Sequence, residues 1–300
     1  ICFSFFKNPC LSLLFCSFFT SFATKITSLS SDSMKRLQLL LLWVWMVCFS
    51  AASHDYMFKH LEVKDGLSNN QVNAIYKDSH GFMWFGTASG LNRYDGYDTR
   101  IYRSLKDDGN SLPDSYIEDI QEDATGNLWV RTGAGYAIYN SVSDIFDRNV
   151  EGWMWHIGIS GNPSTVYIDS EKIFWIYVAG KGIYCYKPGQ ENAVMVAGTD
   201  TLLTEMNITD MTECSEGILL AFGNGVLACL DREKLNVKWT FDGIASQWGK
   251  NQSETFTLFV DSHERVWMYS VEGMWVYHLP KKSWEVRSVR SDRSNMVRAI

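Results

Sequence analysis

The sequence predicts an all-β protein: a β-propeller of four-stranded antiparallel blades of about 45 residues each. First, one motif recurs five times along the 300-residue chain, at intervals of 44 to 48 residues. Second, each copy consists of short runs of alternating apolar and polar residues between turn-forming residues, the pattern of antiparallel strands. Third, aromatic residues make up 14% of the chain, which favours pleated sheet. Four strands in a repeat of this length form one propeller blade.

The motif consists of an acid, a large apolar residue six positions later, and a glycine further on. The acids are Asp78, Asp123, Asp169, Glu213 and Asp261, and the apolar residues are Trp84, Trp129, Trp175, Leu219 and Trp267. A turn glycine also separates the acid from the tryptophan in the first two copies, as Gly81 and Gly126, whereas Lys172 and Arg265 are expected at that position in the third and fifth copies. The fourth copy has lost its tryptophan and departs most from the pattern.

In the first copy, strands are expected over residues 72–77, 82–87, 90–94 and 99–103. Asp78 falls at a hairpin turn, where a carboxylate accepts hydrogen bonds from backbone N–H groups two residues on. Gly81 supplies the positive φ that such turns require, and Trp84 has the area to fill the gap between neighbouring blades. Because an acid recurs in every copy, the motif is predicted to be structural, and no catalytic residue is assigned.

The first 53 residues are expected to lie outside the propeller. Residues 1–33 precede the first methionine and are interpreted as an upstream or non-native leader. Residues 34–53 have a basic start, a short apolar run and small residues at their end, the layout of a signal peptide. Residues 54–300 then form a partial propeller. Residues 295–300 have the pattern of an opening strand, so the propeller is expected to be truncated after about five and a half blades.

Several stretches resemble a known family. They are Asp65-Gly66-Leu67-Ser68, Trp84-Phe85-Gly86-Thr87, Gly90-Leu91-Asn92-Arg93-Tyr94-Asp95-Gly96 and, in the next blade, Asn110-Ser111-Leu112-Pro113. Together with Asp78 and Gly81 they resemble the two-component regulator propellers. The resemblance extends over residues 56–300 and is closest in the first two copies.

The resemblance implies that residues 54–300 are the periplasmic sensor domain of a Bacteroides-type hybrid two-component histidine kinase. Such proteins typically sense an oligosaccharide and switch on genes for glycan use. The implied partners are an oligosaccharide, the remaining blades with the downstream membrane and kinase regions of the parent chain, and a second copy in a homodimer. The implied location is the periplasmic side of an inner-membrane protein. This region itself is expected to catalyse no reaction, to need no cofactor and to make no direct contact with nucleic acid.

Two other classes of propeller stay open as alternatives. Residues 227–231 and 237–241 resemble one repeat of quinoprotein-like propellers, which implies a dehydrogenase or an assembly scaffold. A secreted glycan-active propeller enzyme is the second alternative. Its sialidase-type turn has the spacing Ser-x-Asp-x-Gly-x-x-Trp, whereas two residues separate Asp78 from Gly81 here.

Ligands of propellers bind at a mouth of the central channel, where loops enter the first strands and join the second strands to the third. In the loop that enters the third blade, Trp153 and Trp155 alternate, so both are expected to face one side, where a sugar ring can stack. Arg131 stands where the first copy has the glycine of its Gly-Thr pair. The candidate ligand-binding residues are Trp153, Trp155, His156, Tyr116, Asn69, Asn70, Arg131 and Lys181.

Charge and cysteine usage exclude other classes of function. The net charge of −7 is spread evenly and argues against a nucleic-acid partner, which needs a basic face. Cys185, Cys214 and Cys229 form no C-x-x-C pair, so they are predicted to be small core residues and not a disulfide framework or a zinc site. No metal-binding spacing is found among the histidines.

Overall fold

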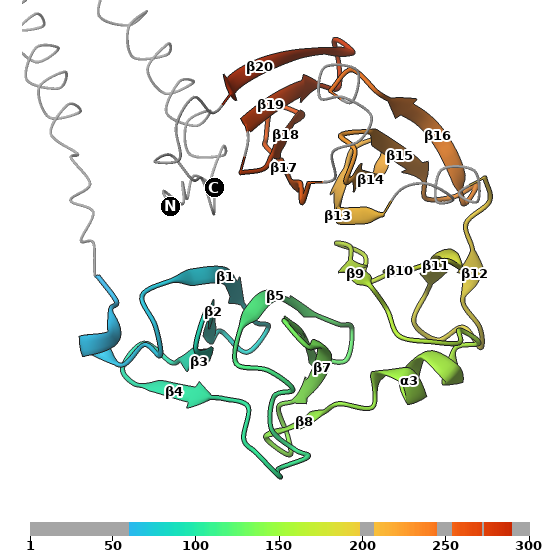
Figure 1. The fold of residues 1–300 in the computed structure, drawn as a ribbon. Helices are drawn as coiled ribbons and strands as arrows, with labels where there is room; N and C mark the ends of the chain where they lie inside the picture. The colour runs from blue at the N-terminus through green and yellow to red at the C-terminus, as the bar shows by residue number, and fades with distance from the viewer. Residues whose placement is uncertain (1–59, 199–206, 245–253, 272, 290–300) are drawn as a thin grey trace, which may run out of the picture. The chain divides into compact units, whose positions relative to one another are not determined.

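The computed structural model describes residues 60–198, 207–244, 254–271 and 273–289. The expected leader (residues 1–33), signal peptide (34–53) and sixth-blade strand (295–300) lie outside the described residues. Among the described residues, no helix is both long and apolar enough to cross a lipid bilayer. In these described ranges, twenty strands form five separate antiparallel sheets of four strands each (Figure 1). The predicted all-β propeller of four-stranded blades is therefore confirmed.

In each blade the four strands are neighbours in chain order. Blade 1 contains β1 (Val72–Lys77), β2 (Met83–Thr87), β3 (Gly90–Tyr94) and β4 (Thr99–Tyr102). Blade 2 contains β5 (Ile117–Glu122), β6 (Leu128–Thr132), β7 (Gly135–Asn140) and β8 (Ile145–Asp147). Blade 3 contains β9 (Thr165–Ile168), β10 (Phe174–Val178), β11 (Gly182–Tyr186) and β12 (Val194–Met195).

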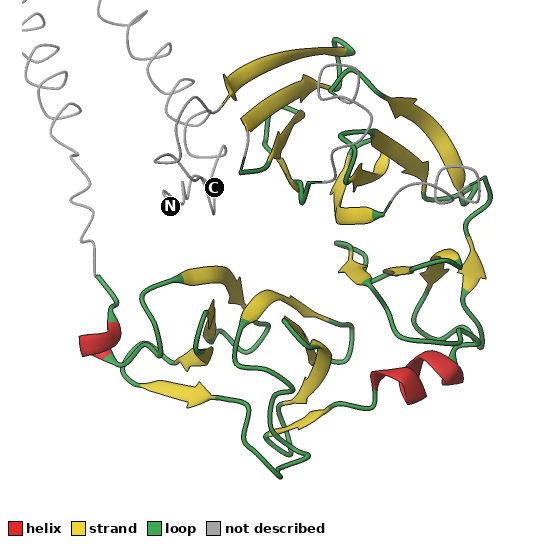
Figure 2. Cartoon of the chain, viewed as in Figure 1, coloured by secondary structure: helices red, strands yellow, loops and turns green. Residues whose placement is uncertain are grey.

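The last two blades follow the same order. Blade 4 contains β13 (Ile208–Cys214), β14 (Gly217–Phe222), β15 (Leu227–Asp231) and β16 (Asn236–Phe241). Blade 5 contains β17 (Thr257–Val260), β18 (Arg265–Tyr269), β19 (Gly273–His278) and β20 (Ser283–Val289). Figure 2 shows how little helix accompanies these strands: a 3-10 turn, η1 (Val63–Asp65), precedes blade 1, and α3 (Val150–His156) joins blades 2 and 3.

The first strands of successive blades pack against one another. Contacts join β1 to β5, β5 to β9, β9 to β13 and β13 to β17, and these strands are the innermost ones in Figure 1. The apolar core lies between the blades, as in the cluster that joins Trp84 and Leu91 of blade 1 to Leu128 and Tyr139 of blade 2. Burial of this interblade surface is the main favourable contribution to the stability of the fold.

The repeated acid ties each hairpin turn to its tryptophan. Asp78 accepts hydrogen bonds from the backbone N–H of Phe82 at 2.9 Å and from Nε1 of Trp84 at 2.7 Å. The same acid-to-indole bond is present at 3.2 Å from Trp129, 3.0 Å from Trp175 and 2.9 Å from Trp267. In these blades the acid joins the hairpin turn to the second strand, and the indole N–H is a partner that the sequence prediction did not include.

The turn glycine of the motif confirms one backbone prediction and corrects another. Gly81 and Gly126 have φ values of 93° and 82°, and Lys172 stands at the equivalent position with φ 64°. In blade 5 the residue with a positive φ is Glu264, at 60°, and not Arg265. Arg265 instead begins β18 and ion-pairs with Asp261 at 2.6 Å.

The assignment of Glu213 as the anchor acid of blade 4 is wrong. Glu213 lies within β13, paired with Ile218, and Cys214 pairs with Gly217 across a two-residue loop. The hairpin is one residue shorter than in blade 1, so Cys214 takes the place of the acid. Glu213 instead accepts a hydrogen bond from the backbone N–H of Ser170 at 2.7 Å and so joins blade 4 to blade 3.

Candidate functional site

A pocket of about 310 Å³ opens where the first strands of the blades begin and the second strands end. Side chains from blades 2, 3, 4 and 5 line it: Arg131, Ser164, Thr165, Tyr177, Ala179, Asn207, Ile208, Thr209 and Thr255. Ligands of propellers are expected at this end of the blades, where loops enter the first strands and join the second strands to the third. The lining consists mainly of hydroxyl and amide groups, which both donate and accept hydrogen bonds.

Arg131 is the predicted ligand residue that lines this pocket. It lies on β6, directly opposite Asp119 of β5, and its Nε is 2.8 Å from a carboxylate oxygen of Glu118. Burial tends to lower the pKa of Arg131, but the nearby Tyr136, Glu118 and Asp119 outweigh burial and raise the pKa above its ordinary value. Arg131 is therefore a firmly held cation at the wall of the pocket.

Asp210 is a partly buried acid close to Arg131. Its carboxylate accepts hydrogen bonds from the backbone N–H of Leu258 at 2.7 Å and of Met211 at 2.8 Å. Burial and, to a smaller extent, the charge of Asp119 raise the pKa of Asp210 to about 7, against the opposing effect of the two hydrogen bonds and Arg131. The protonation state of Asp210 therefore changes near neutral pH.

Asp119 and Asp210 occupy equivalent positions in blades 2 and 4. Each follows a β-bulge in the first strand of its blade. Each also pairs with the second-to-last residue of the second strand: Asp119 with Arg131 and Asp210 with Ala221. Asp119 accepts hydrogen bonds from its neighbours Ile120 and Gln121 at 2.8 and 2.6 Å. Sequence reasoning missed both acids, although an acid directly opposite the unusual Arg131 was a signal that strand pairing could have used.

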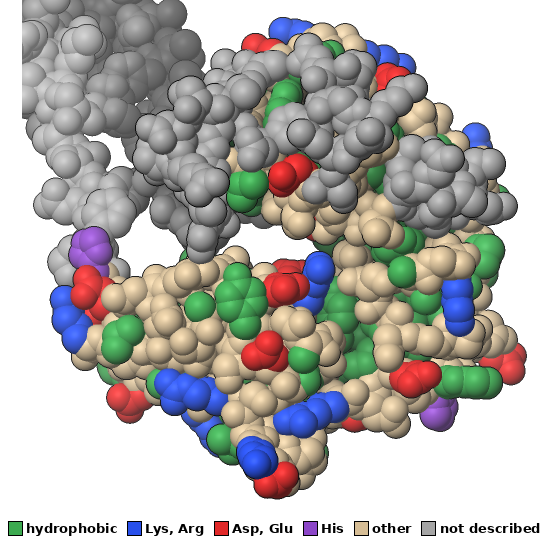
Figure 3. All heavy atoms as spheres, in the orientation of Figure 1, with side chains coloured by type: hydrophobic (Ala, Val, Ile, Leu, Met, Phe, Trp, Pro, Cys, Tyr) green, Lys and Arg blue, Asp and Glu red, His purple; other side chains and the backbone are tan. Residues whose placement is uncertain are grey.

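Charges of both signs therefore meet at this site. Figure 3 shows acidic and basic side chains next to one another over β5, at the inner side of the blades, and intermixed over the rest of this face. The guanidinium, amide and hydroxyl groups of the pocket wall suit a polar ligand that offers many hydrogen-bonding groups, and the acids lie beside this wall. No group of three or more His, Cys, Asp or Glu side chains within the described ranges is placed to hold a metal ion.

The expectation that Trp153 and Trp155 face the same side of a loop is wrong, because their segment is the helix α3. The Asn149 side chain accepts the Gly152 N–H at 3.0 Å, and Val150 and Met154 are buried on one side of the helix. Residues two apart on a helix point in different directions. Trp153 packs on Trp129, with ring centroids 4.6 Å apart, whereas Trp155 is 67% exposed.

The other predicted ligand residues are not part of the pocket wall. His156 is exposed on α3 and its Nδ1 is 2.7 Å from the Gly152 carbonyl oxygen. Lys181 donates to the backbone and side-chain oxygens of Ser160 at 2.8 and 2.7 Å. A ligand role for these two residues and for Trp155 stays a prediction.

The entering segments of blades 1 and 2 carry the last three predicted residues. Asn69 donates to the Ser89 hydroxyl at 3.0 Å, and Asn70 accepts the backbone N–H of Val63 at 2.9 Å. Tyr116 is 41% exposed, next to the loop that joins β6 to β7. The structure thus gives Asn69 and Asn70 local structural partners, and their binding role also stays a prediction.

Residues 66–89 and 111–134, in blades 1 and 2, match the family model described as two component regulator propeller. The first two blades therefore carry two-component regulator propeller repeats. Over 66 residues this regulator propeller is 38% identical to histidine kinase P4 of Formosa agariphila, a match covering 22% of the chain and 5% of that protein.

Two solved structures resemble the regulator propeller. One is the extracellular domain of a putative hybrid two component system from B. thetaiotaomicron, with a TM-score of 0.55, 19% identity, and coverage of 77% of this chain and 31% of that one. The other is the extracellular domain of a putative one component system from the same organism, with a TM-score of 0.57, 20% identity, and coverage of 80% and 34%. This likeness shows the fold, and the chain spans about a third of each solved chain.

Proposed function

We propose that the regulator propeller is the ligand-sensing region of a hybrid two-component histidine kinase on the periplasmic side of the inner membrane. Its ligand is an oligosaccharide, and binding controls genes for glycan use through the kinase of the full-length protein. The family match supports the two-component role. The signal-peptide pattern of residues 34–53 supports export.

The observation that carries the oligosaccharide proposal is the pocket lined by four blades. A sugar offers hydroxyl groups that accept hydrogen bonds from guanidinium and amide groups and that both donate to and accept from hydroxyl groups. Arg131, Asn207 and the hydroxyls of Thr165 and Thr209 supply these partners within one pocket. The site holds a firmly positioned cation among acids, so it suits a polyhydroxylated ligand better than a strongly charged one.

Signalling then follows from differential binding. A ligand that touches several blades favours the blade arrangement in which all its contacts form, and it shifts the population toward that arrangement by its difference in affinity. The inner strands transmit such a shift, because their side chains bond directly to the next blade. Gln121 of blade 2, for example, donates to the Val166 carbonyl oxygen at 3.0 Å and accepts the Ile168 N–H at 2.6 Å.

The test uses the full-length protein in lipid nanodiscs. Defined neutral and uronate-containing oligosaccharides are titrated in a calorimeter, and autophosphorylation with ATP is followed for each. We expect at least one oligosaccharide to bind and to change the phosphorylation rate. Arg131→Gln is expected to weaken that binding about tenfold or more, by roughly the 1.5–3 kcal/mol of a hydrogen bond to a charged group.

The matched control is Arg100→Gln, on the outer strand β4, which removes an exposed arginine paired with Asp144. It should leave both affinity and phosphorylation unchanged. Equal affinity of the Arg131→Gln variant would contradict the site. Turnover of the oligosaccharide by the protein, or a complete lack of kinase activity, would contradict the sensory role.

A further inference from the structure

The pocket of about 310 Å³ that four blades line, the four-blade pocket, presents hydrogen-bond donors to a ligand. Thr165 of β9 is 5% exposed, and its hydroxyl has no hydrogen-bond partner among the described residues. The side-chain oxygen of Asn207 accepts the Tyr177 hydroxyl at 3.2 Å, which leaves the amide NH₂ group to donate. Arg131 uses its Nε for Glu118, and its guanidinium group has further N–H donors. A ligand can therefore accept hydrogen bonds from blade 2, blade 3 and the segment that enters blade 4.

These donors do not decide the charge of the ligand. A carboxylate and a sugar hydroxyl both accept hydrogen bonds from hydroxyl, amide and guanidinium groups. An acidic sugar, which carries a carboxylate, and its neutral counterpart would therefore find the same partners at the wall. The choice between the two depends on the charges around the pocket.

Three acids stand beside this wall, against one arginine. Oε2 of Glu118 lies 2.8 Å from Nε of Arg131, and Asp119 is directly opposite Arg131 in the pair of β5 and β6. Asp210 follows Thr209, which lines the pocket, and its charge acts on Arg131 as do those of Glu118 and Asp119. When all four groups are ionised, the positive charge of Arg131 is more than balanced before any ligand binds.

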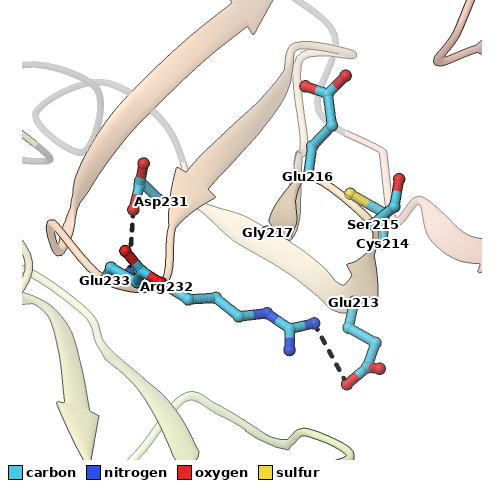
Figure 4. A pocket seen from close by; sticks show the side chains of 8 residues that line it. All are labelled: Glu213, Cys214, Ser215, Glu216, Gly217, Asp231, Arg232 and Glu233. Atoms are coloured by element: carbon cyan, nitrogen blue, oxygen red, sulfur yellow. Dashed lines mark hydrogen bonds and ion pairs between the residues drawn. The ribbon is translucent and has the colours of Figure 1, made fainter.

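A second pocket, of about 490 Å³, differs in the position of its acids (Figure 4). It lies at the opposite ends of the strands of blade 4, and charged groups form much of its wall: Glu213, Glu216, Asp231, Arg232 and Glu233. In Figure 4 Arg232 extends toward Glu213, with which it forms an ion pair of 3.5 Å. Acids in a wall can bond to a ligand directly, whereas acids beside a wall act on the ligand through their charge. The acids of the four-blade pocket are of the second kind.

We propose that the four-blade pocket binds neutral oligosaccharides and discriminates against acidic ones, with Glu118 and Asp119 as specificity-determining residues. This inference rests on the proposed function, because it needs a sugar bound next to Arg131. Specificity is a difference between two affinities, and like charges placed against the unwanted ligand can supply it. A carboxylate in the pocket meets the excess negative charge of the acids, whereas a hydroxyl at the same place keeps its hydrogen bonds without that repulsion.

The test measures the affinity of matched ligands for the full-length protein in lipid nanodiscs by calorimetry at pH 8, above the pKa of Asp210. The probes are tetrasaccharides of glucose, mannose and galactose, each paired with the same tetrasaccharide oxidised to a carboxylate at C6 of one sugar. We expect the neutral member to bind about tenfold or more tightly than the acidic one in about 10 mM salt, where the Debye length is about 30 Å. This preference should fall at least about threefold in about 1 M salt, where the Debye length is about 3 Å. A preference that came from size would not depend on salt.

The variants Glu118→Gln and Asp119→Asn keep the size of the side chain and remove one negative charge. Each should reduce the preference at least about threefold, mainly through tighter binding of the acidic ligand. Glu118 is exposed, so its variant tests the charge even if Asp119→Asn disturbs β5, where the carboxylate accepts hydrogen bonds from Ile120 and Gln121. Glu233→Gln, in the second pocket, is the matched control and should leave the preference unchanged.

Three results would overturn this inference and leave the proposed function standing, because a sugar would still bind. They are equal or tighter binding of the acidic member, a preference that salt does not change, and an unchanged preference in both acid variants. A changed preference in Glu233→Gln would assign the discrimination to the second pocket and also overturn the inference. Failure of every tetrasaccharide to bind would contradict the proposed function and the inference together.

Discussion

Blades 3 and 4 are neighbours that stabilise the same strand positions with different chemistry. In blade 3, the buried Asp169 accepts hydrogen bonds from the Ile173 N–H at 2.9 Å and from Trp175 Nε1 at 3.0 Å. In blade 4, Cys214 and Leu219 take these places, and every residue of β14 is buried. The second strand of blade 3 is fully buried as well, so the difference lies at these two places: an acid–indole bond in blade 3 and two side chains without such a bond in blade 4.

The difference also determines which side chains each blade needs for its stability. Trp175 fills the space between blades 3 and 4 and contacts apolar residues of both. Its Nε1 also donates to Asp169, so removal of the ring costs both packing and a buried hydrogen bond. Blade 4 depends instead on many small apolar contacts around Leu219 and Cys229.

The largest expected effect is that of Trp175→Ala. It should lower the free energy of unfolding by about 3–5 kcal/mol, as measured by urea denaturation, because it leaves a cavity and removes one of the hydrogen bonds to the Asp169 carboxylate. Trp155→Ala, at a tryptophan that is 67% exposed, is the control and should change stability by about 0.5 kcal/mol or less. A similar cost for both variants would remove the distinction between the two tryptophans.

Asp210→Asn tests the partly buried acid of blade 4. The pKa of Asp210 is raised to about 7, so the folded protein keeps a proton that the unfolded chain loses near its ordinary value of 3.8. The stability from this group is therefore fully present below about pH 4 and is lost as pH rises through 7. Relative to Asp210→Asn, the wild type should lose about 1–3 kcal/mol of unfolding free energy between pH 4 and pH 8, and a constant difference would contradict this.

Asp261→Asn should show the opposite pH dependence in blade 5, with a smaller amplitude. Burial would raise the pKa of Asp261, but hydrogen bonds from Trp267 and from the backbone of Arg265 and His263 hold it well below its ordinary range. Its stabilisation is present above about pH 4 and is lost as pH falls further. The urea midpoint of the wild type should thus decrease more on acidification than that of the variant. Parallel curves would show that the acid–indole bond contributes nothing in this blade.

The smallest effect is expected at the turn position that holds a glycine in blades 1 and 2 and another residue in blades 3 and 5. Glu264 has a left-handed φ of 60°, a conformation that glycine adopts more easily. Glu264→Gly should raise the unfolding free energy by about 0.5 kcal/mol, whereas Gly126→Ala, at φ 82°, should lower it by about 1 kcal/mol. Thermal unfolding measures both, and an equal sign for the two changes would refute the backbone explanation.

Strand positions could be predicted closely because alternation and turn residues act locally. The strands expected over 72–77 and 90–94 have those bounds in the structure, and the other two of the blade end or begin within one residue. The failures involve longer-range effects. The pattern around Trp153 and Trp155 resembles a strand, but burial of Val150 and Met154 against neighbouring blades favours a helix. The shortened hairpin of blade 4 hid the replacement of the acid by Cys214.

The candidate site could be predicted only in part. Arg131 was found because it breaks the repeat, a signal that needs no structure. Asp119 and Asp210 were not, because an acid in an alternating strand resembles an ordinary solvent-facing residue. Only the contact between first strands of different blades, which are far apart in sequence, brings these acids together.

Several bonds between the inner strands run in one direction along the chain, whereas Glu122 and Glu213 bind back to the main chain of Ser79 and Ser170. Asn73 donates to the Ile117 carbonyl oxygen, Gln121 binds the backbone of Val166 and Ile168, and Thr209 and Asp210 bind the backbone of Phe256 and Leu258. In each case the earlier blade supplies the side chain and the later blade the main chain. During synthesis on the ribosome, every completed blade therefore presents finished docking groups before the backbone that will occupy them has been made.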